Sequence, residues 1–458
     1  MKVALTHGFF LSADEAEQKI MRPYPPLGLL YISAYLDQQQ IDHDVFDSTF
    51  RSMDELFAFL TELKPDYLGI YVNFLTRINV VKMINRIRSE ALLKNMKMIL
   101  GGPDVRYHAE NYLKQGADFI VVGEGEETFY ELISALDRQT EINHIAGLIY
   151  KDHDSHIQTG ERAHIRDLDT LPFPNRQKID LSVYLNAWKQ KYGYSSITIS
   201  TQRGCPFTCN WCSHAVFGDT YRRRSPQSVM DELEILMNDY HPDSFWFVDD
   251  VFTMSERWVN EFTAELEKRN LKIAYECISR ADKLNEDIIL NLKKSGCRTL
   301  WIGAESGSQK IIDRMDRRVD VMRVREMLKL TRQHGIEAGT FIMLGYPDEK
   351  ISDINETIRH LKESNPDTFT INLAYPIKGT RLYEDVEDQI ISNMVWAEVP
   401  DREIDFIRTY KRSFYDFAIR KVYNEVYAHK FYLKREYLYF ARFKLKSMLA
   451  GFFMMLTK

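Results

Sequence analysis

The sequence predicts an α/β protein with two consecutive α/β domains and a helical C-terminal region. Short apolar runs alternate with amphipathic stretches over residues 1–140, and a second series of this kind begins at residue 195. The residues after 385 are aromatic and helical in pattern. With 45% hydrophobic and 28% charged residues among 458, the composition is that of a globular protein with material for more than one core.

In residues 1–140 five apolar runs alternate with five amphipathic stretches. This pattern predicts an open, doubly wound, Rossmann-like parallel sheet. The expected strands are Lys2–Thr6, His43–Asp47, Tyr67–Val72, Met96–Leu100 and Phe119–Val122. The expected helices are Leu27–Gln38, Asp54–Lys64, Val80–Ala91, His108–Gln115 and Glu127–Asp137.

The loops after the fourth and fifth strands are candidate binding loops, because such sheets bind ligands at the carboxyl ends of their strands. They contain Gly101 and Gly102 after the fourth strand, and Gly123, Glu124, Gly125 and Glu126 after the fifth. The simpler interpretation of the second loop is a tight turn with favourable negative charge at a helix N-terminus.

Residues 141–194 predict a connector. It contains a small hairpin, Ala146–Tyr150 turning at Asp152-His153-Asp154, and a rigid extended segment, Leu171–Pro174. A partial (β/α)6 TIM-like barrel is then predicted over 195–384, with its chemistry at the carboxyl ends of the strands. The expected strands are Ser196–Thr201, Ser244–Val248, Ile273–Ser279, Thr299–Ala304, Ala338–Leu344 and Thr368–Ala374.

The region 385–458 is predicted to be helical and basic. From Ile407 to Lys458 there are 12 Lys and Arg residues against three acids, whereas the whole chain has a net charge of −6. For the segment from Lys430 to Lys458 two interpretations stay open: a helix that packs on the barrel, which is favoured, and an interfacial helix that contacts a membrane surface or a lipid-like substrate. The overall charge argues against a nucleic-acid partner.

The N-terminus has no signal-peptide pattern, and no apolar run approaches the roughly 20 residues of a membrane span. A cytoplasmic location is therefore expected.

Three cysteines, Cys205, Cys209 and Cys212, lie within eight residues and directly follow the first expected barrel strand. Clustered cysteines without a secretion signal indicate metal ligands before disulfides. Three thiolates at this spacing can bind three irons of a [4Fe–4S] cluster and leave the fourth iron open. A structural zinc site normally has four ligands, and only His214 lies near enough in sequence to complete one.

This segment, with Trp211 before the third cysteine, resembles the cluster motif of the radical S-adenosylmethionine (SAM) superfamily. Over residues 1–385 the chain resembles the class that joins a cobalamin-type Rossmann domain to the radical SAM barrel. The motifs that carry this wider resemblance are Tyr221–Pro226, Gly296-Cys297, Glu305–Ser308 and Tyr375–Thr380.

The resemblance implies a [4Fe–4S] cluster on the three cysteines and SAM bound at the ends of the barrel strands. Its implied SAM contacts are Trp211, Asp249, Asp250, Ser279, Arg280, Glu305, Ser306 and Gly345. Arg280 is expected to pair with the SAM carboxylate, Glu305 and Ser306 with its ribose or amine, and Gly345 to lie near the adenine. The simpler interpretation of Asp249 and Asp250 is a helix cap.

Cobalamin is implied by the same class, although the Asp-x-His-x-x-Gly signature of other B12 proteins is missing from the first β-α loop. Many members bind cobalamin without that histidine, and some bind none.

The predicted activity is reductive cleavage of SAM to a 5′-deoxyadenosyl radical, used for cobalamin-dependent C-methylation of an unactivated carbon. The alternatives are a radical SAM cyclase, dehydratase or oxidase without methyl transfer, and a cobalamin or iron–sulfur sensor without turnover. A small-molecule or lipid-like substrate and an external electron donor of flavodoxin or ferredoxin type are expected.

Overall fold

The computed structural model describes residues 1–153, 155–391 and 396–458. The chain divides into two compact units. The first comprises residues 1–206, 213–245 and 394–401, and the second comprises residues 207–212, 246–393 and 402–458. The predicted domain boundaries at 140, 194 and 384 stay a prediction.

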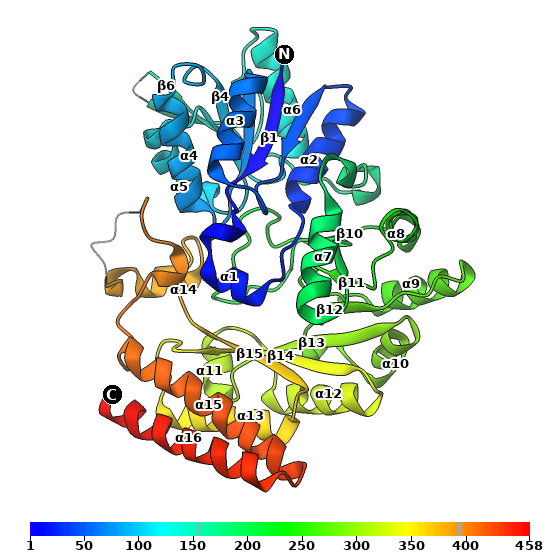
Figure 1. The fold of residues 1–458 in the computed structure, drawn as a ribbon, viewed down its shortest axis with the longest axis vertical. Helices are drawn as coiled ribbons and strands as arrows, with labels where there is room; N and C mark the ends of the chain where they lie inside the picture. Colours follow the sequence, from blue (N-terminus) through cyan, green and yellow to red (C-terminus); the bar gives the residue numbers. More distant parts are fainter. Residues whose placement is uncertain (154, 392–395) are drawn as a thin grey trace. The chain divides into compact units, whose positions relative to one another are not determined.

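The first unit contains a seven-stranded sheet in the order β2-β1-β3-β4-β5-β6-β7 (Figure 1). Its strands are β1 (Val3–His7), β2 (His43–Phe46), β3 (Tyr67–Tyr71), β4 (Lys97–Gly101), β5 (Phe119–Val121), β6 (Leu148–Asp152) and β7 (Ser155–Gln158). The first five strands are parallel, with Val3 opposite both His43 and Tyr67. The predicted parallel sheet is therefore confirmed, and every expected strand lies within one residue of its observed position.

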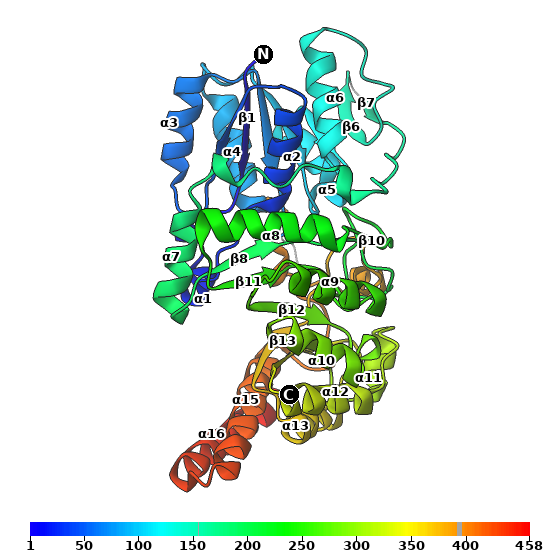
Figure 2. The same cartoon turned by 90° about the vertical axis from the view of Figure 1, so that its right-hand side faces the viewer.

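Helices cover both faces of this sheet (Figure 2), so the doubly wound arrangement is confirmed. The helices are α1 (Glu15–Ile20), α2 (Leu27–Gln38), α3 (Met53–Leu63), α4 (Arg77–Ser89), α5 (Val105–Gln115) and α6 (Glu126–Asp137). Apolar side chains of α3, α4 and α5 pack on one face, and those of α2 and α6 pack on the other.

The predicted hairpin is confirmed, but it belongs to the first sheet rather than to a separate connector. β6 pairs antiparallel with β5, with Ile120 opposite Ile149, and β7 follows at the edge. The expected turn residue Asp154 lies outside the described residues. The rest of the unit contains α7 (Leu181–Tyr192), β8 (Ser196–Ile199), β9 (Gln202–Arg203), β10 (Arg222–Arg223) and α8 (Pro226–Tyr240).

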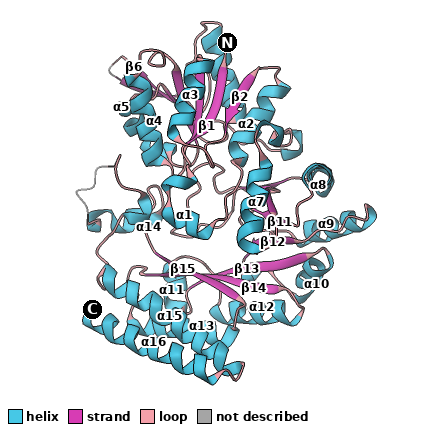
Figure 3. Ribbon diagram, viewed as in Figure 1, coloured by secondary structure: helices cyan, strands magenta, loops and turns pink. Residues whose placement is uncertain are grey.

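The second unit carries parallel strands and helices that belong to the predicted barrel (Figure 3). The strands are β11 (Ser244–Phe247), β12 (Tyr275–Ser279), β13 (Cys297–Glu305), β14 (Glu337–Leu344) and β15 (Thr368–Leu373), in the sheet order β15-β14-β13-β12-β11-β8. The helices between and after them are α9 (Glu256–Lys268), α10 (Glu286–Lys294), α11 (Gln309–Arg314), α12 (Val321–Gln333), α13 (Ile351–Ser364) and α14 (Arg381–Val386).

The C-terminal region forms two long helices, α15 (Arg412–Leu433) and α16 (Tyr437–Leu456), as predicted. α15 packs against α13 and α16 packs against α15. The Tyr423 ring stacks on Phe369 with centroids 4.9 Å apart. Residues 430–458, for which the two interpretations stay open, consist mainly of α16, which packs on α15 and has a largely exposed apolar surface. In the described part of the chain, no helix meets the length and hydropathy that crossing a membrane requires.

Candidate functional site

The three clustered cysteines lie in a loop whose ends are held together by a short antiparallel pair. Arg203 of β9 lies opposite Arg222 of β10. Gly204 adopts a positive φ of 82°, and a Cβ there would come within 2.4 Å of the Thr220 carbonyl oxygen, so only glycine fits. Glycine at position 204 therefore allows the two chain segments to lie close together one residue before the first cysteine.

Cys209 lies beside two arginine side chains. The Arg280 Nη1 atom is 3.5 Å from its Sγ atom, and the Arg317 Nη1 atom is 3.8 Å away. The Arg280 guanidinium lies over the Phe207 ring, 3.6 Å from its centroid, and that of Arg317 lies 5.6 Å from the Trp211 ring centroid. Two positively charged side chains therefore lie within 4 Å of this sulfur atom.

Arg317 is a candidate site residue that sequence reasoning missed. It lies in the turn after α11 rather than at a strand end, and nothing in the pattern distinguishes it from the exposed Arg318 that follows it. In the folded chain its guanidinium lies against Gly303, where an added Cβ would come within 2.4 Å of the Arg317 Nη2 atom. Gly303 therefore makes room for the buried guanidinium.

Glu305 ends β13 with a positive φ of 63°, an uncommon conformation for a residue with a side chain. Its carboxylate lies 3.5 Å from Arg317 Nη2. Burial raises the pKa of Glu305, while the charges of Arg317 and Arg280 oppose that rise. A buried carboxyl with a perturbed pKa at a strand end is typical of a functional site.

The other predicted SAM contacts lie at the ends of their strands or on the loops that follow, and several already have partners. Asp249 is buried and Asp250 is exposed. Ser279 and Thr253 form a hydrogen bond through their hydroxyl groups. The Ser306 hydroxyl accepts a hydrogen bond from the Ser308 N–H at 3.1 Å, which closes the turn after β13. Arg280 donates to Asp282 at 2.9 Å.

Gly345 is held by the buried carboxyl of Glu349, which accepts its N–H at 2.7 Å. Gly345 has a φ of 76°, and a Cβ would come within 2.6 Å of the Leu373 side chain. Glu349 is 0% exposed, and burial raises the pKa of its carboxyl to about 8.

Replacing Glu349 by glutamine is expected to remove a pH dependence of stability. A carboxyl with a raised folded pKa contributes stability that is complete below its ordinary pKa and is lost as the pH rises through about 8. Between pH 6 and pH 8 the wild-type free energy of unfolding should fall by roughly 2–3 kcal/mol relative to the variant. Urea unfolding at both pH values measures this, and parallel profiles would rule it out.

The predicted loops of the first sheet differ in the space beside their backbone. At Gly101 and Gly123 an added Cβ would meet no atom nearer than 3.8 Å. At Gly102, with a φ of 115°, it would come within 2.3 Å of the Val72 carbonyl oxygen, and at Gly125 it would meet Ile32 at 3.3 Å. A Cβ at Gly101 or Gly123 would therefore make only ordinary van der Waals contact with its neighbours, whereas at Gly102 it would clash, so Gly102 shapes the turn.

The side chains of Glu124 and Glu126 are engaged by arginines. Arg203 donates to Glu124 at 2.7 Å and to Glu126 at 2.5 Å, and Arg222 donates to Glu124 at 2.7 Å. Both carboxylates are buried. Cofactor binding by these two residues stays a prediction, and their carboxylates already have protein partners.

The chemistry of the donor set fits an iron–sulfur cluster. All five cysteines are thiols, and Cys205 and Cys209 are buried while Cys212 is exposed. Over the described ranges, no three His, Cys, Asp or Glu side chains are gathered as they would be around a metal ion. The fit therefore rests on three thiols in one loop and on the two guanidinium groups that lie beside Cys209.

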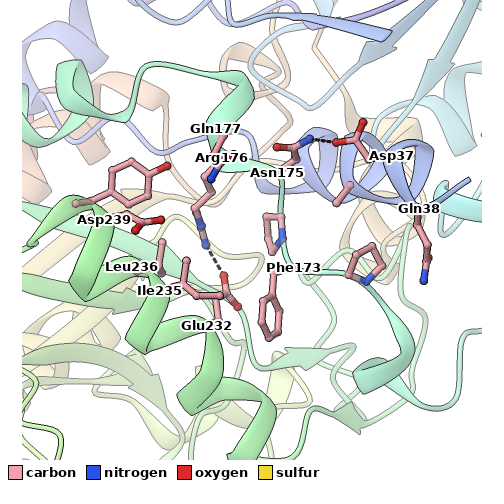
Figure 4. Close-up of a pocket in the computed structure, with 14 residues that line it drawn as sticks. Asp37, Gln38, Phe173, Asn175, Arg176, Gln177, Glu232, Ile235, Leu236 and Asp239 are labelled. Carbon is pink, nitrogen blue, oxygen red and sulfur yellow. Dashed lines mark hydrogen bonds and ion pairs between the residues drawn. The ribbon is translucent and has the colours of Figure 1, made fainter. Parts of the chain in front are cut away.

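A pocket of about 470 Å³ in the first unit contains none of the predicted site residues (Figure 4). The connector, α2 and α8 line it. Its buried Arg176 donates to Glu232 at 2.7 Å and to the Thr198 carbonyl oxygen at 2.9 Å. These contacts tie the connector to α8 and β8.

Two family models match the chain. The model of the radical SAM superfamily matches residues 199–361, and that of the B12 binding domain matches residues 19–133. An uncharacterized methyltransferase of Pyrococcus horikoshii is 29% identical, covering 82% of this chain and 81% of the relative. The anaerobic magnesium-protoporphyrin IX monomethyl ester cyclase of Cereibacter sphaeroides is 26% identical, covering 85% of this chain and 64% of the cyclase.

A solved structure shares the fold. The radical SAM methyltransferase TsrM from Kitasatospora setae, with cobalamin and a [4Fe–4S] cluster bound, has a TM-score of 0.70 and 16% identity. The match covers 84% of this chain and 74% of TsrM.

Proposed function

Because the chain belongs to the radical SAM superfamily and carries a B12 binding domain, we propose that it catalyses cobalamin-dependent methylation of an unactivated carbon in a small molecule. The observation that carries the proposal is the three-cysteine loop with two buried arginines beside Cys209. TsrM, whose fold is shared, binds cobalamin and is a methyltransferase, which supports the same reaction type here.

Cys205, Cys209 and Cys212 would hold the cluster, which supplies the electron that cleaves SAM to a 5′-deoxyadenosyl radical. The guanidinium groups of Arg280 and Arg317 offset negative charge at Cys209. Around SAM, we propose contacts from Trp211, Asp249, Asp250, Ser279, Arg280, Glu305, Ser306 and Gly345. Glu305 and Arg280 have complementary charges for its amine and carboxylate.

Cobalamin would lie against the backbone of Gly101, Gly102, Gly123 and Gly125 and supply the methyl group. The match of residues 19–133 to the B12 binding domain supports this assignment. An external electron donor of flavodoxin or ferredoxin type would supply the electrons for this chemistry.

The alternative is a radical SAM cyclase, dehydratase or oxidase, and the similarity to the anaerobic cyclase favours this class. Cobalamin-dependent methyl transfer distinguishes the proposed reaction from these alternatives. Anaerobically reconstituted protein should release S-adenosylhomocysteine only when cobalamin, SAM and reductant are present. Formation of 5′-deoxyadenosine without cobalamin-dependent S-adenosylhomocysteine would move the assignment to the cyclase class.

We further propose that the exposed face of α16 contacts an anionic membrane surface. Residues 432–456 contain twelve of the 25 large apolar side chains that are exposed among the described residues. Ser447, Ala450 and Met454 are buried, whereas Leu438 is 88% exposed. The helix contains Arg442, Lys444 and Lys446 and no acidic residue, a pattern that favours anionic lipid over a second copy with the same charge.

Flotation with vesicles containing phosphatidylserine tests this surface. Binding should fall at least fivefold when Leu449 and Phe452 are replaced by glutamate, and should remain when the exposed Leu290 of α10 is replaced instead. Equal flotation of both variants would overturn the proposal, and so would dimerisation that only the α16 substitutions abolish.

A further inference from the structure

We infer that Glu124, Glu126, Arg203 and Arg222 form a clasp that closes the two ends of the cysteine loop onto the end of β5 and positions the thiols. The four side chains come from the loop after β5, the start of α6, and the pair β9–β10. This inference rests on the proposed cluster site but concerns residues that do not ligate iron.

A single carboxylate bridges both ends of the loop. One carboxylate oxygen of Glu124 accepts a hydrogen bond from Arg203 Nη1, and the other accepts one from Arg222 Nη1, each at 2.7 Å. Arg203 also reaches Glu126 at 2.5 Å, so its guanidinium spans two carboxylates. Residues 204–221, including all three cysteines, lie between the two arginines in sequence.

The clasp is buried and its hydrogen bonds are well satisfied. The four side chains are 3–9% exposed. The Ile165 N–H donates to Glu124 at 3.0 Å, and the Ile165 carbonyl oxygen accepts from Arg222 at 2.8 Å. Burial alone would raise the pKa of Glu124, but Arg203 and Arg222 outweigh it and hold that pKa below its ordinary value. These buried ion pairs hold the β9–β10 pair against the loop after β5, and losing one partner would leave a buried charge unpaired.

The chain after the third cysteine is anchored to the same region. Arg106 of α5 donates to the Ala215 carbonyl oxygen at 3.0 Å. The Arg203 guanidinium lies near the rings of Tyr31 and Phe217, 5.0 and 5.3 Å from their centroids. The chain on both sides of the cysteines is thereby held by α5 and by the loop after β5, which restricts where the cysteine loop can lie.

The variant Glu124→Gln tests the clasp, with Glu127→Gln as the matched control. Glu127 lies in the first turn of α6, three residues after Glu124, and its carboxylate pairs with Arg162 at 2.8 Å rather than with Arg203 or Arg222. Hydrogen exchange of residues 204–221 is measured in the cluster-free full chain, and the rate of iron removal by a chelator is measured in the reconstituted protein.

Glu124→Gln should speed exchange in this loop and iron loss at least tenfold, whereas Glu127→Gln should match the wild type. Arg203→Lys, which keeps the charge but cannot span two carboxylates, should be intermediate and provides a second test if Glu124→Gln fails to fold. Unchanged loop exchange in both variants would overturn the clasp, as would exchange that rises equally throughout the first sheet. If the wild type binds no iron, the proposed function fails, and the exchange measurement still decides the clasp.

Discussion

Replacing Cys209 by alanine is expected to abolish cluster binding and 5′-deoxyadenosine formation. The loop has only three cysteines, and a cluster with one open iron needs all three as ligands. Cys209 is the cysteine that lies beside Arg280 and Arg317. After anaerobic reconstitution, iron content should fall from about four per chain to a small fraction of that value, with loss of the visible absorption of the cluster.

Cys277→Ala is the control for this substitution. Cys277 is buried in β12, with its sulfur 4.0 Å from that of Cys297, and the loop motif does not include it. Its variant should retain iron and SAM cleavage. Full iron retention by Cys209→Ala, with catalytic release of 5′-deoxyadenosine, would contradict the ligand assignment.

Replacing Arg317 by methionine is expected to cause the largest loss of stability among charge substitutions around the site. It removes the cation 3.5 Å from the buried Glu305 carboxylate. Breaking a buried pair by removing one partner costs about 3–5 kcal/mol, because the remaining charge is unpaired. The measurement is the free energy of unfolding from urea titration.

The loss should also depend on pH. Burial already raises the pKa of Glu305, and removing Arg317 takes away an interaction that lowers it. The stability of the variant should therefore decline more steeply than that of the wild type as the pH rises above the ordinary carboxyl pKa. Arg318→Met is the control, since Arg318 is exposed and pairs with Asp316, and it should change stability by less than about 0.5 kcal/mol. Equal effects of the two substitutions would contradict the assignment.

The sequence predicted those features that local pattern determines. The periodicity of the apolar residues and the turn residues between them predict the strands of both sheets. The predicted strand ends place Glu305 and Arg280 without any tertiary information. The cysteine spacing predicts a cluster loop because all three residues lie in one segment.

Features that depend on distant contacts could not be predicted. Glu124 and Arg203 are 79 positions apart, so the pattern after β5 suggested a cofactor loop, while the folded chain directs its carboxylates to arginines. Arg317 and Cys209 are 108 positions apart, and only packing against Gly303 identifies the arginine. The hairpin was expected in a connector because no residue pattern within it indicates that β6 pairs with β5.

The most direct test of the account is mass spectrometry of the nucleoside products after anaerobic incubation of the reconstituted protein with SAM and dithionite. We expect 5′-deoxyadenosine from the wild type and none above background from Cys209→Ala. Absence of 5′-deoxyadenosine from a wild-type protein that holds its full cluster would contradict the claim that this chain cleaves SAM to start radical chemistry.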